Sequence, residues 1–247
     1  ADYLVAPARQ LLPVGDLDLV QAAPLTDAGL TPYHAVNICR DALVPGSTCV
    51  VIGVGGLGHM AIQILKTTTA ARVIAVDVSD EALAMAASLG ADHPIVSNPE
   101  AAGYIRDLVG PPPGGVDVVI DCVGRQSTLD LAAAVVTTGG QIAIVGLGGG
   151  AVPVAAGAHV PWEVRVTNPF WGTRKELAEV IALARMGRIT AHVETFPLAD
   201  ASSAYERMRA GTLRGRAVIL PPAGERLRQQ EHAGARAGAG VPARRAT

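Results

Sequence analysis

The sequence predicts an α/β fold with a doubly wound parallel sheet, and three of its features support this. Short apolar runs alternate with helical segments over residues 49–147, as in repeated strand–helix–strand units. The apolar runs are nearly continuous, for example Val118-Val119-Ile120, which is typical of strands that helices cover on both faces. A glycine-rich turn follows the first run directly, with the sequence Gly53-Val54-Gly55-Gly56-Leu57-Gly58.

The order of the elements follows from these patterns and from residues that start and stop helices. Six strands are expected in the sheet, at residues 49–54, 72–77, 94–96, 116–121, 141–146 and 164–168. Helices are expected between and after them, at 57–68, at 79–90, after Ser97-Asn98-Pro99-Glu100, at 127–139 and at 173–187. The start signals are Ser79 as an N-cap, Pro99 at a first helical position, the capping-box variant Ser127-x-x-Asp130, and Thr173-x-x-Glu176.

The two ends of the chain differ from this alternation. A short strand at 192–196, a helix at 200–210 and a strand at 216–220 are expected after the sheet. Residues 1–15 resemble extended β pieces that need partners elsewhere. Residues 221–247 are rich in Ala, Gly and Arg without an apolar period, so we expect a disordered tail there. A basic tail that binds an acidic surface is the alternative.

Composition excludes several classes of function. A net charge of −2 and an aromatic content of 3% argue against a nucleic-acid-binding surface. No apolar stretch reaches the roughly 18 residues that a membrane span needs, and no signal peptide is visible. Cys39, Cys49 and Cys122 form no C-x-x-C pair, as expected in a reducing cytoplasm without disulfides. The chain begins at Ala1 and its first methionine is Met60, which is compatible with a fragment of a longer protein.

The glycine turn has the pattern that binds the pyrophosphate of a dinucleotide. Gly53 allows the tight turn, Gly55 lets the backbone approach the pyrophosphate, and Gly58 lets the helix pack against the strand. The helix that starts near Leu57 directs its free N–H groups and the positive end of its dipole toward that pyrophosphate. A plain strand-to-helix turn without a ligand is the alternative.

An acid at the end of the second strand indicates which dinucleotide would bind. Asp77 lies 24 residues after Gly53, close to where an acid accepts hydrogen bonds from the adenosine ribose hydroxyls. This favours NAD over NADP. Asp77 could instead be an ordinary strand-end cap, because Ser79 and Asp80 follow it.

Several runs of the sequence carry a resemblance to a known family. They are Pro24-Leu25-Thr26-Asp27-Ala28-Gly29-Leu30-Thr31-Pro32-Tyr33-His34-Ala35, Pro45-Gly46-Ser47-Thr48, Val51-Ile52-Gly53-Val54-Gly55-Gly56-Leu57-Gly58-His59, Asp121-Cys122-Val123-Gly124, Trp171-Gly172-Thr173-Arg174 and Leu213-Arg214-Gly215-Arg216. From about Ala1 to Leu220 the chain resembles zinc-dependent medium-chain alcohol dehydrogenases, and most of all the bacterial NAD-dependent members.

The resemblance implies a domain organisation. In this family a GroES-like catalytic domain is split in the sequence around a Rossmann domain, which is the doubly wound sheet predicted above. The resemblance places remnants of the catalytic domain at residues 1–36 and 171–220, and the NAD-binding Rossmann domain at residues 37–170.

The resemblance also assigns cofactor contacts beyond those that the turn suggests. Besides Gly53, Gly55 and Gly58, it includes Gly56 and Leu57 in the pyrophosphate site and adds Arg214 as a pyrophosphate contact. Val123 would line the adenine or ribose pocket, and the backbone of Val145 and Gly146 would meet the nicotinamide amide. Read without the family, Arg214 is a solvated turn residue, and Val145 and Gly146 simply end a strand.

The family's catalytic zinc is represented here by one residue. Its ligands include a Cys and the His of a Gly-His-Glu motif, and this chain contains no Gly-His-Glu. The third ligand falls on Asp27, which would take the place that other members give to Cys. Read without the family, Asp27 is an acid at a helix start. His34, Cys39 and Cys49 lie nearby in sequence, but their spacings fit no ligand pattern.

The resemblance therefore implies an NAD-dependent oxidoreductase that interconverts alcohols with aldehydes or ketones. Hydride transfer would be zinc-assisted in the full-length form, of which this chain retains mainly the cofactor half. An NAD-binding fragment or dimerisation module without turnover is the alternative, and a zinc-independent quinone-type reductase is disfavoured. We expect a small-molecule substrate, a homodimer or homotetramer in the full-length form, and no nucleic acid or membrane partner.

Overall fold

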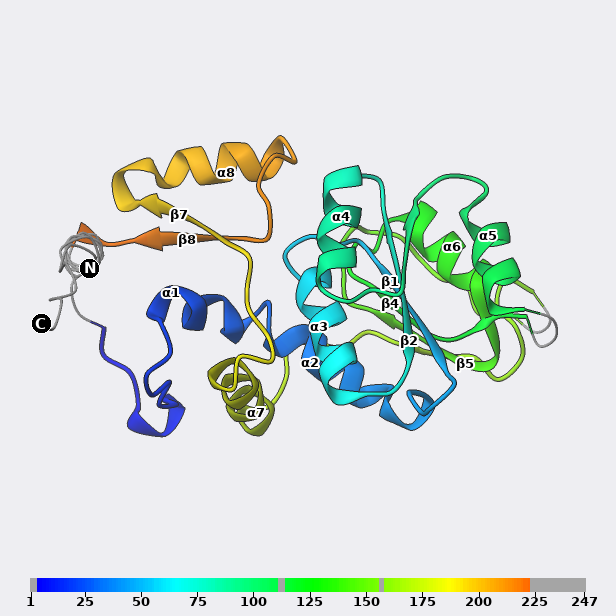
Figure 1. Ribbon diagram of the computed structural model, residues 1–247, viewed down its shortest axis with the longest axis horizontal. Coiled ribbons are helices and arrows are strands. Elements are labelled where there is room, and N and C mark those ends of the chain that lie inside the picture. The colour runs from blue at the N-terminus through cyan, green and yellow to red at the C-terminus, as the bar shows by residue number, and fades with distance from the viewer. Residues whose placement is uncertain (1–3, 111–113, 156–157, 223–247) are drawn as a thin grey trace, which may run out of the picture. The chain divides into compact units, whose positions relative to one another are not determined.

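A parallel six-stranded sheet forms the centre of the larger of two compact units (Figure 1). The computed structural model describes residues 4–110, 114–155 and 158–222. The strands lie in the order β3-β2-β1-β4-β5-β6, and every neighbouring pair is parallel. Their bounds are β1 (Thr48–Ile52), β2 (Arg72–Asp77), β3 (His93–Val96), β4 (Val116–Asp121), β5 (Val136–Ile144) and β6 (Arg165–Thr167). The predicted doubly wound sheet is confirmed.

Side chains that alternate along each strand divide between two hydrophobic clusters, one on each face of the sheet. On β1, Cys49 and Val51 enter the first cluster, and Val50 and Ile52 enter the second. The first cluster includes residues of α2 (Leu30–Ile38), α3 (Gly58–Thr68), α4 (Asp80–Ser88) and α7 (Arg174–Arg185). The second includes residues of α5 (Ala101–Val109) and α6 (Gln126–Val135). Helices on both faces explain why the strands are apolar without interruption.

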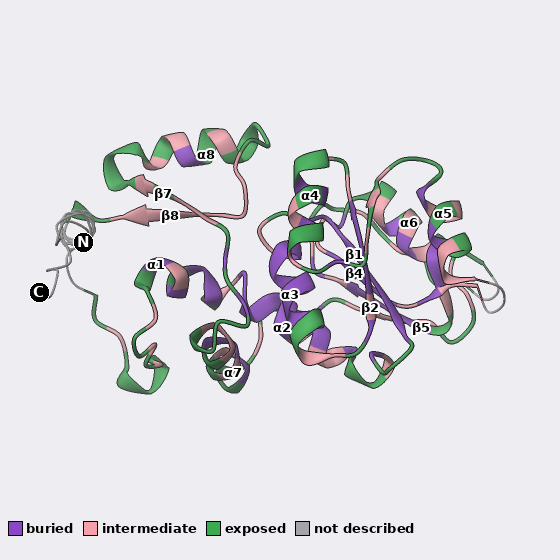
Figure 2. Cartoon of the chain, in the orientation of Figure 1, coloured by how far each residue is buried: buried purple, intermediate pink, exposed green. Residues whose placement is uncertain are grey.

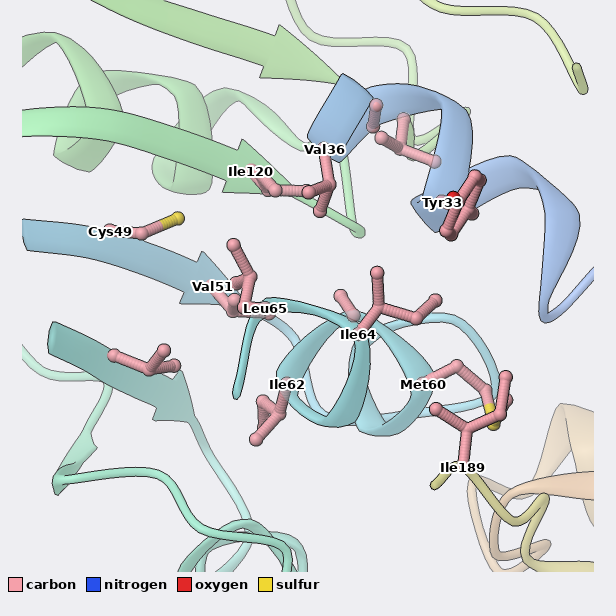
Figure 3. Packing of buried hydrophobic residues seen from close by; sticks show 14 of the residues in the cluster. Tyr33, Val36, Cys49, Val51, Met60, Ile62, Ile64, Leu65, Ile120 and Ile189 are labelled. Atoms are coloured by element: carbon pink, nitrogen blue, oxygen red, sulfur yellow. The ribbon is translucent and has the colours of Figure 1, made fainter. Parts of the chain in front are cut away.

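Helix α3 is the most buried helix among the described residues of this unit. Its first eight residues, Gly58 to Leu65, are all buried (Figure 2). Figure 3 shows α3 between the strand residue Val51 and a segment on its other side, where Met60 lies beside Ile189. A helix buried on all sides leaves no solvent for its polar side chains, so each of them needs a partner within the protein.

Some helix starts differ from the prediction. Ser79 caps α4 and the Thr173–Glu176 capping box starts α7, as expected. Pro99, however, lies before α5, whose N-cap is Glu100. The capping box expected at Ser127 is wrong, because α6 starts one residue earlier, at Gln126, and no side chain caps it.

The end of α6 also differs, because β5 begins immediately after this helix. The strand starts at Val136 instead of 141, since Val136 pairs with Val116 of β4 before the register shifts. The helix therefore ends at Val135 and does not continue to Gly139.

The second unit contains mainly residues 4–11, 194–213 and 217–222 of the described chain. It contains the paired strands β7 (Val193–Pro197) and β8 (Arg216–Leu220), the helix α8 (Ala201–Arg209), and the 3-10 turns η1 (Ala8–Gln10) and η4 (Leu198–Asp200). These match the predicted strand, helix and strand. The extended pieces expected at residues 1–15 are not found in residues 4–15, where η1 is the only regular element. Residues 223–247 of the predicted tail lie outside the described residues.

Short elements complete the larger unit, namely α1 (Leu19–Ala22), η2 (Ala23–Thr26) and η3 (Arg40–Ala42). Within the described ranges, no helix combines the length and the apolar character that crossing a membrane requires.

Candidate functional site

In the glycine turn between β1 and α3, two glycines are closely packed and a third is open. Gly53 takes a φ of +85°, and a Cβ on it would lie 2.4 Å from Val123 Cγ2. A Cβ on Gly58 would lie 1.8 Å from the carbonyl oxygen of Gly53, so strand and helix meet at a distance that only glycine allows. A Cβ on Gly55 would meet no atom within 4 Å. The turn is therefore packed beneath Gly53 and Gly58 and open above Gly55.

The open face presents unused backbone donors. Gly53 donates its N–H to Val76 O at 2.7 Å. Among the described residues, no backbone hydrogen bond takes up the N–H groups of Gly55, Gly56 or Leu57, and no side chain caps α3. Free N–H groups at the start of an 11-residue helix attract a negatively charged group.

Asp77, at the end of β2, is tied to the turn by both of its carboxylate oxygens. Oδ2 accepts the N–H of Val54 at 2.7 Å, and Oδ1 accepts the N–H of Ser79 at 2.9 Å. Asp77 thus orients the loop before α4 and also lies beside the glycine turn. Each oxygen can accept a second hydrogen bond, so the carboxylate can still receive a ribose hydroxyl. The cap role and the ligand role are compatible.

The ends of β4 and β5 adjoin the turn at the same edge of the sheet. Asp121 is fully buried, and its Oδ1 accepts the N–H of Val123 at 2.8 Å. The main-chain oxygen of Asp121 accepts the N–H groups of Val145 and Gly146, at 2.8 and 2.9 Å. A Cβ on Gly146 would lie 2.1 Å from the carbonyl carbon of Val123. Val123, Val145 and Gly146 are thereby brought together, and Val123 also touches Gly53. Asp121 accepts hydrogen bonds from all three, and the sequence analysis did not predict it as a site residue.

Of the two neighbouring arginines, Arg216 is the one that lies against the turn. Its Cδ would be 2.7 Å from a Cβ on Gly56. Arg214, which the resemblance assigns to the pyrophosphate, forms an ion pair with Glu81 of α4. The two arginines flank Gly215, whose φ of +63° turns the chain between them. The sequence alone does not indicate which of the two arginines faces the turn.

Asp27, the expected metal ligand, is occupied by other partners. Arg216 Nη2 donates to Asp27 Oδ2 at 2.5 Å, and Thr31 Oγ1 donates to Oδ1 at 3.2 Å. Within the described ranges, no group of three or more His, Cys, Asp or Glu side chains is placed to hold a metal ion. These residues therefore do not fit a zinc ion, which requires about three protein ligands.

The nearby candidates have other roles. His34 Nδ1 lies 2.9 Å from Glu176 Oε1 in the contact between α2 and α7. Burial raises the pKa of Cys39 to about 11 and that of Cys49 well above its usual value. Both thiols are therefore protonated near neutral pH and are poor nucleophiles.

Comparison with known proteins places this site in a family context. A family model described as zinc-binding dehydrogenase matches residues 56–185, which is more than half of the 247 residues. An alcohol dehydrogenase of Geobacillus stearothermophilus is 35% identical over 221 residues, which is 89% of this chain and 63% of that protein. An NAD-dependent alcohol dehydrogenase of Sulfurisphaera tokodaii is 35% identical over 225 residues, which is 90% of this chain and 64% of that protein. The chain thus spans slightly less than two thirds of the length of these relatives.

Solved structures of an alcohol dehydrogenase and of a reductase are also similar to this chain. The alcohol dehydrogenase of the archaeon Aeropyrum pernix aligns with a TM-score of 0.77 and 37% identity, covering 83% of this chain and 60% of that one. An acetophenone reductase of Geotrichum candidum, solved in complex with NAD, aligns with a TM-score of 0.68 and 33% identity, covering 80% and 54%.

Proposed function

The chain belongs to the family of zinc-binding medium-chain alcohol dehydrogenases, and from this we infer that it binds NAD at the glycine turn. It would serve as the cofactor half of an oxidoreductase that interconverts alcohols with aldehydes or ketones. The observation that carries this proposal is the open face of Gly55 beside backbone N–H groups that no hydrogen bond within the described residues takes up. The positive end of α3 at that face would attract a pyrophosphate.

Each part of the cofactor has a candidate partner at this edge of the sheet. The N–H groups of Gly55, Gly56 and Leu57 would hold the pyrophosphate, with a guanidinium from Arg216 or, as the sequence suggested, Arg214. Asp77 would accept the adenosine ribose hydroxyls. Val123 would line the adenine or ribose pocket, and the backbone of Val145 and Gly146 would orient the nicotinamide amide.

The chemistry divides between cofactor and protein. Bound NAD supplies the acceptor for a hydride from the alcohol carbon. The residues of this chain orient the dinucleotide along the sheet edge, and the buried ends of β4 and β5 keep water from its inner side. Asp27 is committed to Arg216 in the described residues, so we propose it as a metal ligand only together with ligands that those residues do not supply.

The pair between Asp27 and Arg216 supports a second candidate function. If the chain acts by itself, the same observation favours a module that binds NAD without turning over an alcohol. We further propose that residues 1–36 and 171–220 represent parts of a GroES-like domain, and that the complete protein is a homodimer or homotetramer.

Titration of the purified chain with NADH and NADPH, followed by cofactor fluorescence, tests the cofactor assignment. We expect saturable binding of NADH and about tenfold weaker binding of NADPH, because its 2′-phosphate would meet the Asp77 carboxylate. An Asp77→Asn variant should bring the two affinities close together, since it removes the charge and keeps the size. Absence of saturable NADH binding up to millimolar concentrations would overturn the proposal.

Oxidation assays separate the two candidate functions. We expect negligible oxidation of ethanol or 2-propanol by the chain alone, with or without added zinc. Clear zinc-dependent turnover by this chain would favour the complete enzyme over the binding module.

A further inference from the structure

Two polar side chains lie inside the most buried helix of the larger unit. His59 is 0% exposed and Gln63 is 8% exposed, and they are one turn apart on α3. Burying such groups without hydrogen bonds is strongly unfavourable. Their partners therefore show what the sequence keeps them for.

Both side chains bond to one short segment, residues 190–192. The Gln63 amide donates to Thr190 O and accepts the N–H of Thr190, both at 2.9 Å, as a neighbouring strand would. The next two N–H groups also go to side chains, Ala191 to Gln21 Oε1 at 3.0 Å and His192 to His59 Nε2 at 3.1 Å. Hydrogen bonding of buried polar groups is enough to explain these bonds. It does not explain why position 59 is a histidine, whose ring has a second nitrogen.

His59 uses its other ring nitrogen on the glycine turn. Nδ1 lies 2.8 Å from the carbonyl oxygen of Gly55. Because Nε2 accepts the His192 N–H, the proton of the neutral ring is on Nδ1, which donates to Gly55. Burial, with a smaller contribution from the positive charge of Arg216 and from His192, lowers the pKa of His59 to about 4. The neutral ring can thus make both bonds near neutral pH.

The segment that His59 holds also supports Arg216. The N–H of Arg216 donates to His192 O at 2.9 Å, and a Cβ on Gly215 would lie 2.1 Å from the same oxygen. The side chain of Arg216 then returns to Gly56 of the turn. The contacts form a closed ring that runs from Gly55 through His59, His192 and Arg216 back to Gly56.

We propose that His59 is a positioning residue for the pyrophosphate site, a role that rests on the proposed function. Its ring bond to the Gly55 carbonyl, at 2.8 Å, adds to the backbone bond from the His59 N–H to the same oxygen, at 3.2 Å. Together they hold that carbonyl toward the helix, so the N–H groups of the turn face outward to the phosphate. Its bond to His192 fixes the segment from which Arg216 reaches Gly56. One buried imidazole thus sets both the backbone donors and the guanidinium.

Three variants separate the two bonds of the ring. His59→Phe removes both, His59→Asn keeps a donor near Nδ1, and His59→Gln keeps an acceptor near Nε2. Gln141→Leu is the matched control, because Gln141 is 2% exposed and its amide bonds to Asp41, not to the turn. The ligands are NADH and ADP, which contain a pyrophosphate, and adenosine, which does not.

Dissociation constants, from fluorescence for NADH and from NMR titration for ADP and adenosine, give the test. We expect His59→Phe to weaken NADH and ADP roughly tenfold or more and to leave adenosine unchanged. His59→Asn and His59→Gln should each lose less, and Gln141→Leu should lower only the melting temperature. If His59→Phe does not fold, the other two variants decide by the same ratio.

The outcomes for the two proposals are distinct. Wild-type chain that does not bind NADH overturns the proposed function itself. Wild-type chain that binds NADH, with His59 variants that keep the same ratio of ADP to adenosine affinity, leaves that function standing and overturns the positioning role.

Discussion

The glycine turn and the Asp27 position differ in how completely the described residues build them. At the turn, Gly53 and Gly58 are packed, Asp77 is oriented by two bonds, and only the face above Gly55 is open. At Asp27, a single carboxylate bonds to Arg216 and Thr31. A phosphate site made of backbone N–H groups is local to one strand and one helix. A metal site needs several side chains that distant parts of a sequence must supply.

The largest expected effect comes from filling the closed side of the turn. Gly58→Ala places a Cβ 1.8 Å from the backbone oxygen of Gly53, which no side-chain rotation can relieve. We expect a loss of more than about 3 kcal/mol in the free energy of unfolding, with loss of NADH binding. Urea unfolding followed by circular dichroism measures this.

Gly103→Ala serves as the control for that substitution. Gly103 is in α5, and a Cβ on it would meet no atom within 4 Å, so alanine there should be neutral or stabilise by about 0.5 to 1 kcal/mol. Equal stability of the Gly58→Ala and Gly103→Ala proteins would mean that the strand and helix do not meet as described.

Acid should weaken the buried side of the site next. The pKa of His59 is about 4 in the folded chain against 6.5 in the unfolded one, so the unfolded state binds the proton first. Stability should therefore fall by about 3 kcal/mol as the pH drops from about 6.5 to about 4. Unfolding curves across this range measure it, and His59→Phe should flatten the slope. An unchanged slope in that variant would assign the acid sensitivity elsewhere.

Filling the open side of the turn should affect binding alone. Gly55→Ala meets no protein atom, so the melting temperature should stay within about 2 °C of the wild type. Its methyl group would occupy the space of the pyrophosphate, and NADH affinity should fall about tenfold. A Gly55→Ala protein that binds NADH as the wild type does would place the cofactor elsewhere.

The smallest effect is expected where the two regions meet. Asp27→Ala removes the carboxylate that neutralises Arg216, and this pair is partly exposed, so stability should change by less than about 1 kcal/mol. The guanidinium then faces the pyrophosphate without competition, and NADH affinity should rise about twofold to fivefold at low salt. Weaker binding in this variant would indicate that Asp27 holds Arg216 in place for the cofactor.

Local signals predicted the sheet and much of the turn. The strands of the sheet were predicted from apolar runs. The pattern of glycines predicted a tight turn at Gly53, an open Gly55 and a closely packed Gly58, and the φ of Gly53 and the room for a Cβ at the other two agree with this. The capping box at the start of α7 was also predicted, because its two residues, Thr173 and Glu176, are only three positions apart.

Features that depend on contacts between distant segments could not be predicted from the sequence. Arg216 reaches the turn because Gly215 redirects the chain, and its bond to Asp27 joins residues 189 positions apart. The early start of β5 depends on Val116, a residue of another strand. Similarly, the bond between His59 and His192 and the bonds between Gln63 and Thr190 join residues 133 and 127 positions apart. Propensity and periodicity report neighbours along the chain, and these contacts are not between such neighbours.

One measurement tests the contrast between the glycine turn, which we propose as the NAD site, and the single carboxylate of Asp27. The dissociation constant of NADH is determined by fluorescence for the chain treated with EDTA and again after addition of zinc. If the glycine turn is complete by itself, both preparations bind NADH with the same affinity within about twofold. Binding that appears only when zinc is present would contradict this and would make the two regions a single site.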